Sequence, residues 1–212
     1  MPTASRVAVS AADHVPAQVA FALIFAAALV RWGLVAGGIT GVLAYVIASA
    51  ALSQLPQYAA ITLGVTALAA GALLLPHQPA HKPRPRKPPV TIAICLSAAV
   101  AVLTATLASR VAGPALGGAV AGFPATTTTL AIFIAVQGER SHAANVAFGL
   151  ISSLPCFMAF ALVVVAAAPR LGLVSVPLAA IAALAVAAFT WRQMNARLTR
   201  RRQRLMSWGA DR

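Results

Sequence analysis

The sequence predicts an all-α fold, a polytopic transmembrane helix bundle of about seven helices and six at the fewest. Of its 212 residues, 60% are hydrophobic and only 9% are charged, whereas soluble domains carry about 25% charged residues. A soluble protein this apolar would lack the polar surface that must cover its core. Lipid removes that requirement, and the abundant alanine suits membrane helices that pack closely.

Seven stretches are long and apolar enough to cross the hydrocarbon core as helices. A crossing needs ~20 mostly apolar residues, and lipid forces it to be helical because every backbone group must be paired internally. The first stretch ends at Val30 and begins between Ala4 and Pro16. The other six are 33–53, 57–75, 90–108, 111–136, 143–168 and 173–191.

A basic, proline-rich segment at 76–89 divides the chain. Because proline removes a backbone donor and blocks helix formation, we expect an extended linker there. It separates a three-helix part (1–75) from a four-helix part (90–191). The basic tail at 192–212 is expected to form a short helix on the membrane surface.

The charge distribution predicts how the chain is oriented. The net charge is +13, and arginine and lysine concentrate in the linker and the tail. Short basic loops stay in the cytoplasm, so both segments are expected there, in contact with anionic lipids. Four predicted helices, an even number, separate the linker from the tail, so both can lie on the cytoplasmic side. Three predicted helices precede the linker, which places the N-terminus outside the cytoplasm. We expect no nucleic-acid partner, because the predicted membrane helices leave no segment that could form a nucleic-acid-binding fold.

The first predicted helix and its turn are repeated late in the chain. Residues 19–35 align without a gap to 158–174, at an offset of 139, and ten of 17 positions are identical. Because alanine-rich segments match by chance, the strongest of the ten identities are Phe21/Phe160, Arg31/Arg170 and Gly33/Gly172. Five helices apart, the copies would have opposite orientation, as in transporters built from inverted repeats. We predict a partial inverted repeat; the alternative is coincidence between alanine-rich helices.

The stretch GPALGGAVAGFPATTTT at 113–129 is the most distinctive feature of the chain. Its glycines give overlapping small-xxx-small spacings that let a neighbouring helix pack tightly. Pro124 is predicted to break the helix next to Phe123. The freed carbonyls and the threonine hydroxyls that follow could then coordinate an ion or a substrate. The alternative is a kinked packing helix whose hydroxyls bond to their own backbone.

Two further polar pairs occupy matching positions in the predicted repeat. Asp13 and His14 align with Ser152 and Ser153, and Pro155 is predicted to kink the sixth helix. A carboxylate inside the membrane is costly and usually functional, and a histidine beside it could titrate. The alternative is that Asp13 and His14 lie in a solvated N-terminal segment. The candidate substrate or ion pathway comprises Asp13, His14, Pro124, Thr126, Thr127, Thr128, Thr129, Ser152, Ser153 and Pro155.

Glu139 and Arg140 follow Gly138 in the loop between the fifth and sixth predicted helices. Glu139 either complements the dipole at the start of the next helix or contacts substrate as part of a gate. The chain has no metal-ligand spacing, nucleophile elbow or phosphate-binding loop. We therefore expect no enzymatic activity, no metal and no cofactor.

Several short motifs occur in order along the second half of the chain. GPALGGAVAGFP is followed by an apolar run, by GER at 138–140 and by LPCF at 154–157. On these motifs residues 90–191 resemble the GlpM-like family of small bacterial membrane proteins. RWG at 31–33 resembles a turn in longer, two-repeat bacterial membrane proteins. The threonine run and the GER spacing depart from the family pattern. The resemblance implies a bacterial inner-membrane location, and it carries over no activity and no functional residues.

The sequence supports two functional hypotheses. The first is a transporter-like protein for a small solute, suggested by the repeat and by the proline-broken helix. The second is a structural or assembly module that does not transport but stabilises a partner or the envelope. The small-residue faces and the sparse polar content suggest this alternative. A homo-oligomer or a membrane partner is compatible with both.

Overall fold

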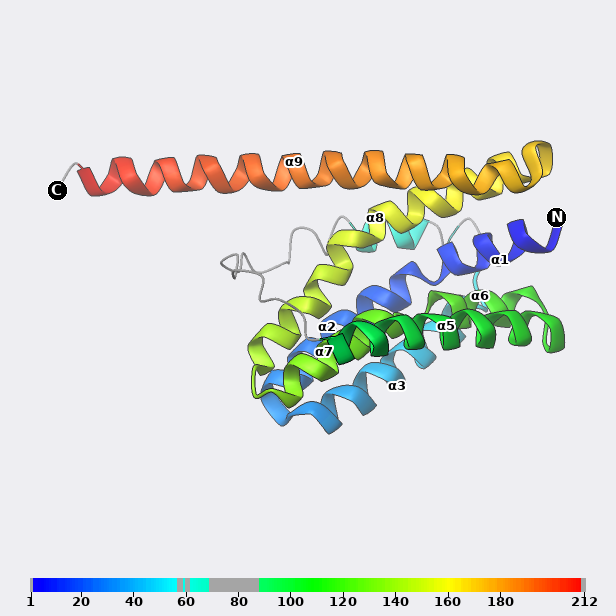
Figure 1. Cartoon of the computed structure of the whole chain (residues 1–212), viewed down its shortest axis with the longest axis horizontal. Helices are drawn as coiled ribbons and strands as arrows, with labels where there is room; N and C mark the ends of the chain where they lie inside the picture. The colour runs from blue at the N-terminus through cyan, green and yellow to red at the C-terminus, as the bar shows by residue number, and fades with distance from the viewer. Residues whose placement is uncertain (1, 57–58, 60–61, 69–87, 211–212) are drawn as a thin grey trace.

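The computed structural model describes residues 2–56, 59, 62–68 and 88–210 (Figure 1). Every regular element in these residues is helical, which confirms the predicted all-α class. The elements are α1 (Pro2–Asp13), α2 (Val15–Trp32), α3 (Leu34–Leu52), α5 (Pro88–Val111), α6 (Pro114–Gly122), α7 (Ala125–Val136), α8 (Arg140–Leu171), the short 3₁₀ helix η1 (Gly172–Val174) and α9 (Ser175–Ala210).

Five helical segments within the described residues are long and apolar enough to cross a membrane. They are Arg6–Trp32, Leu34–Leu52, Thr91–Val111, Ala115–Val136 and Arg140–Arg192. Length and composition therefore support a membrane-embedded protein. The predicted span at 57–75 and the linker at 76–89 fall mostly outside the described residues, although 62–68 are helical.

α2 and α3 run in opposite directions, as do α8 and α9, whereas α1 and α2 run in the same direction (Figure 1). α2 packs against α3, and α8 packs against α9, so each pair forms a hairpin. α1 and α2 run opposite to α8 in the same view. The labelled N- and C-termini lie at opposite ends of the structure.

Two predicted helices are divided by proline. The first predicted helix is α1 followed by α2, and the division lies just before Pro16, which has no N–H to donate. The predicted span at 111–136 is α6 followed by α7, so the predicted break at Phe123–Pro124 is confirmed. The chain is also broken before α6, at Gly113. Its φ of 89° is a backbone conformation that glycine adopts readily and other residues rarely adopt.

Other boundaries differ from prediction. α5 begins at Pro88 instead of residue 90, because a proline in the first helical turn removes a donor that has no partner there. α8 remains one helix through both Pro155 and Pro169. The tail is helical as predicted, but it extends α9 without interruption instead of forming a separate surface element.

α2 forms the centre of the bundle. Ten of the 18 residues of α2 are buried, whereas most of residues 91–111 of α5 are exposed. The side chains of Phe21, Phe25 and Leu29 are almost fully buried. The rings of Phe21 and Phe25 stack with centroids 5.4 Å apart. Because lipid tails are as apolar as these side chains, close packing rather than exclusion from water must hold the helices together.

Glycines on α3 make the close contact with α2 possible. A Cβ at Gly41 would lie 2.9 Å from Cβ of Phe25, and one at Gly37 would lie 3.0 Å from the backbone of Leu29. The turn between the two helices is at Gly33, whose φ is 93°. The small residues therefore set the spacing of the first hairpin.

Gly41→Ala should destabilise the bundle by about 1–3 kcal/mol, because the added methyl group must displace Phe25. Gly38→Ala is the matched control, since a Cβ there meets nothing within 4 Å. We expect the control to be neutral or stabilising by about 0.5–1 kcal/mol, because alanine favours helix over glycine. Unfolding of the purified variants in mixed micelles measures both changes. Equal stabilities would contradict this packing.

Candidate functional site

A histidine side chain forms a hydrogen bond with a backbone carbonyl that is freed at the break between α1 and α2. The N–H of His14 bonds to the carbonyl of Ala11, three residues back, at 3.3 Å. This leaves the carbonyl of Ser10 without its usual helical donor. Nδ1 of His14 lies 2.5 Å from that oxygen. Because a carbonyl can only accept, Nδ1–H is the donor in this bond.

The break between α6 and α7 repeats the same pattern. The N–H of Phe123 bonds to the carbonyl of Val120 at 3.1 Å, three residues back, which leaves the carbonyl of Ala119 free. The hydroxyl of Tyr45 on α3 donates to Ala119 at 2.5 Å. Beyond the break, the N–H of Ala125 bonds to the carbonyl of Phe123 at 2.8 Å, which closes a tight γ-turn. At each break, a side chain therefore satisfies one of the freed carbonyls.

The two broken helices pack directly against each other. α1 contacts α6 extensively, and the hydroxyl of Ser10 donates to the carbonyl of Ala115 at 3.0 Å. A Cβ at Gly118 would clash with Ser10, and one at Gly122 would lie 2.9 Å from the Tyr45 hydroxyl and 3.3 Å from Cβ of His14. The predicted tight packing of the glycine stretch is thus confirmed, with α1 as one of its neighbours.

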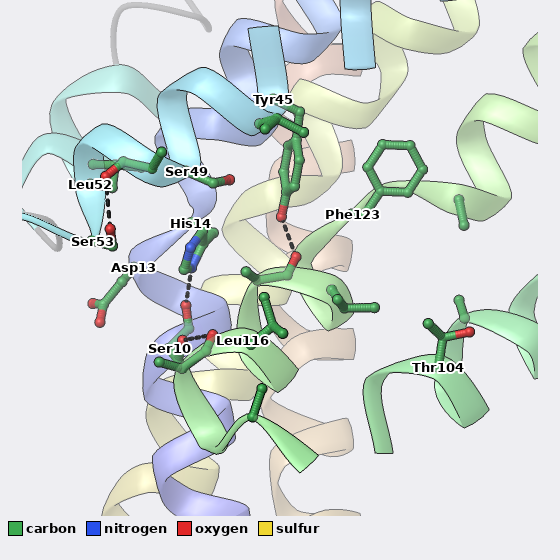
Figure 2. A pocket seen from close by; sticks show the side chains of 18 of the residues that line it. Ser10, Asp13, His14, Tyr45, Ser49, Leu52, Ser53, Thr104, Leu116 and Phe123 are labelled. Carbon is green, nitrogen blue, oxygen red and sulfur yellow. Dashed lines mark hydrogen bonds between the residues drawn. The ribbon is translucent and has the colours of Figure 1, made fainter. Parts of the chain in front are cut away.

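A cavity of about 1310 Å³ lies beside this crossing (Figure 2). Its walls come mainly from α1, α3, α5 and α6 and from the break at Phe123, with one residue each from α7 and α8. Its polar lining residues are Arg6, Ser10, Asp13, His14, Tyr45, Ser49, Ser53, Ser97 and Thr104. Ring contacts place Phe123 edge-on to both Tyr45 and Phe21, with centroids 5.3 and 5.6 Å apart.

Asp13 places a carboxylate oxygen without a hydrogen-bond partner at this site. It lines the cavity, and its Oδ1 is buried without a hydrogen-bond partner among the described residues. No ion pair involves it within that part of the chain. His14, next to it, is 6% exposed. Asp13 and His14 lie within the helical segment Arg6–Trp32, which is long and apolar enough to cross a membrane.

The predicted threonine run lies outside the cavity. Phe123 and Ala125 line it, but Thr126, Thr127, Thr128 and Thr129 do not. The Thr128 hydroxyl donates to the carbonyl of Pro124 at 2.8 Å, and the Thr129 hydroxyl donates to Ala125 at 2.9 Å. These two hydroxyls bond to their own helix, which is the alternative that the sequence left open.

The serines of α8 also lie away from the cavity. Ser152 and Ser153 are exposed, and each donates to a carbonyl three residues back, at 2.7 Å. Pro155 does not line the cavity either. Of the predicted pathway residues, the structure brings together Asp13 and His14 and leaves the others on different surfaces.

The loop residues form a separate polar cluster at the end of the bundle. Glu139 occupies the N-cap position of α8, and its carboxylate pairs with Nδ1 of His142 in the first turn. The guanidinium of Arg140 lies over Gly33, 3.6 Å from the position of a Cβ there. A cation at this point complements the C-terminal dipole of α2. Glu139 is at the N-cap position, but its side chain makes no cap hydrogen bond to α8, so its predicted roles stay predictions.

Sequence reasoning missed several residues of the site, although their spacing contains a signal. Arg6, Ser10 and Asp13 recur at i, i+4 and i+7 on α1, so they share one helix face. Tyr45 and Ser49 are four residues apart on α3, whose other residues are apolar except Thr40. A polar stripe on a membrane helix marks a surface turned away from lipid.

Comparison of the chain with known protein families, with curated proteins and with solved structures finds no match. The resemblance of residues 90–191 to the GlpM-like family therefore stays a prediction. Within the described residues, no group of three or more His, Cys, Asp and Glu side chains could hold a metal ion. The cavity and the two helix breaks are the structural features that bear on function.

Tyr45→Phe should destabilise the protein by about 1–3 kcal/mol, because the carbonyl of Ala119 would lose its donor in a water-poor setting. Thr106→Val is the matched control. It removes a hydroxyl from an exposed position where that hydroxyl bonds only to its own helix, at Val102. Thermal unfolding in detergent compares the two. Equal losses would mean that the Tyr45 hydroxyl does not satisfy the broken helix.

Proposed function

We propose that this chain is a transporter-like protein of the bacterial inner membrane, and that it moves a small solute through the cavity beside the α1–α6 crossing. The observation that supports this most strongly is the packing of two discontinuous helices with their breaks at one cavity. Secondary transporters typically build their sites from such helices near the middle of the membrane. In this proposal Asp13 and His14 contact the solute or a coupling ion, with Tyr45 and Ser10 beside them.

The predicted repeat adds support to the proposal. Gly33 and Gly172 occupy matching positions, both have positive φ (93° and 57°), and each lies between two helices of a hairpin. α1 and α2 together end at Trp32, and α8 ends at the matching position, Leu171. The opposite directions of α2 and α8 in Figure 1 fit an inverted arrangement. We propose that the two hairpins are copies of one unit.

We also propose seven crossings, with the N-terminus outside and the C-terminus in the cytoplasm. An odd number of crossings fits termini at opposite ends of the structure (Figure 1). The basic tail and the basic linker would then share the cytoplasmic side, as the charge bias of membrane proteins favours. Anionic lipids are the partners proposed for both segments.

A non-transporting structural or assembly role is the alternative. It is favoured by α5 and α9, which leave large apolar faces uncovered, including Leu96, Leu103, Ile181 and Leu184 at 62–69% exposure. These faces are also what lipid alone would cover. The alternative requires no solute to move, so the accumulation experiment below separates the two roles.

A cytoplasmic reporter fused after Arg212 should be active, and a periplasmic reporter at the same position should be silent. The opposite result should be obtained when the reporters are placed before Met1. Paired fusions of a fluorescent protein and an alkaline phosphatase measure both ends. Activity of the phosphatase at the C-terminal fusion would contradict the proposed orientation.

Asp13→Asn should abolish solute accumulation, because the proposed site would lose its charge while keeping its shape. Proteoliposomes with wild-type or variant protein would be incubated in the low-molecular-weight fraction of a bacterial extract, and retained solutes identified by mass spectrometry. We expect at least one solute that wild-type vesicles accumulate about tenfold more than Asp13→Asn vesicles.

Ser152→Ala is the matched control for this experiment, since that serine is exposed on α8 outside the cavity. The control should accumulate the same solutes as the wild type. If wild-type and protein-free vesicles retain the same solutes, the transport proposal fails and the assembly role is favoured.

A further inference from the structure

We infer that the cavity binds an amphiphilic cation, a molecule with an apolar body and one positively charged group, and that this ligand arrives from the bilayer between α3 and α5. The inference rests on the proposed function in naming the class of solute that the site would take. Three properties of the cavity support it: where it opens, what lines most of its wall, and where its charge lies.

The cavity opens onto the apolar exterior of the bundle. Val42 and Val46 on α3 line it and are also 41% and 55% exposed. Val100 on α5 lines it from the other side and is 54% exposed. All three belong to membrane-length helices, whose exposed faces meet lipid. A ligand that is dissolved in the bilayer can therefore reach the cavity sideways.

Most of the wall is apolar. α3 and α5 contribute valine and alanine over several turns, and Leu116 and Phe123 extend this surface beside α6. The volume of about 1310 Å³ exceeds the usual range for drug-sized ligands, roughly 300–1,000 Å³. A small inorganic ion would leave most of this surface uncovered, whereas a bulky apolar body would bury it.

The charge lies on the α1 wall. Asp13 is the acidic residue that lines the cavity in the described part of the chain, and its Oδ1 has no partner there. Arg6 lines the same wall seven residues earlier, about 10 Å along the helix. It is exposed, so its long side chain can extend toward the membrane surface. A cation held at Asp13 would offset the cost of a carboxylate at this depth.

Two ions of the same shape and opposite charge test this inference. Tetraphenylphosphonium and tetraphenylborate would be titrated onto the full chain in lipid nanodiscs, with binding to protein-free nanodiscs subtracted. Asp13→Asn should raise the dissociation constant of tetraphenylphosphonium about tenfold or more. The same change should leave tetraphenylborate binding unaltered or strengthen it.

Glu139→Gln is the matched control, because it removes the same charge from a loop outside the cavity. It should leave the binding of both ions unchanged. Val46→Trp should slow tetraphenylphosphonium binding by narrowing the opening, whereas Leu184→Trp, on the exposed face of α9, should not. Circular dichroism and gel filtration identify variants that fail to fold, and Asp13→Ser would replace an unfolded Asp13→Asn.

The inference is overturned if Asp13→Asn leaves tetraphenylphosphonium binding unchanged. It is also overturned if tetraphenylborate is the ion bound in the cavity and Arg6→Gln removes that binding. The measurement needs no solute to cross a membrane. A failure here is therefore distinct from a failure of the accumulation experiment, which tests transport.

Discussion

The structure depends on one constraint, that each backbone carbonyl freed inside a membrane must find a donor within the protein. Water is absent from the hydrocarbon core, and each unsatisfied group there costs several kcal/mol. Pro16 and Pro124 each interrupt a helix, and at each interruption a carbonyl loses its usual N–H. His14 and Tyr45 supply the missing donors. The breaks can persist because these side chains are held in place by packing.

The same constraint explains why the glycine-rich helix lies where it does. The Tyr45 hydroxyl reaches the carbonyl of Ala119 because Gly122 leaves room for it, since a Cβ there would lie 2.9 Å from the hydroxyl oxygen. Gly118 permits the equivalent approach of α1. The edge-on contact of Phe123 with Tyr45 then fixes the phenol ring. The glycines therefore leave the room in which polar side chains reach the carbonyls of the broken helices.

Much of the fold could be predicted from the sequence because lipid limits the choices. Apolar length and proline placement were sufficient to predict an all-α protein and the break at Phe123–Pro124. The break before Pro16 was not assigned, since residues 1–14 look polar when read without their neighbours. The site was predicted only at Asp13 and His14. The polarity of Thr128 suggested that its hydroxyl would contact a ligand. The hydroxyl instead donates to a backbone carbonyl of its own helix. Whether a threonine does so depends on its rotamer, which the sequence does not specify.

The proposed repeat gives a reason for the unequal chemistry of the two hairpins. At matching positions the first copy has Asp13, His14 and a helix break, while the second has Ser152, Ser153 and a continuous helix through Pro155. Both serine hydroxyls donate to backbone carbonyls of their own helix. The second copy can therefore face lipid without a polar cavity. The charged copy cannot, because a carboxylate exposed to hydrocarbon is costly. It packs against the broken, glycine-rich α6, and there its carboxylate lines the cavity beside the α1–α6 crossing.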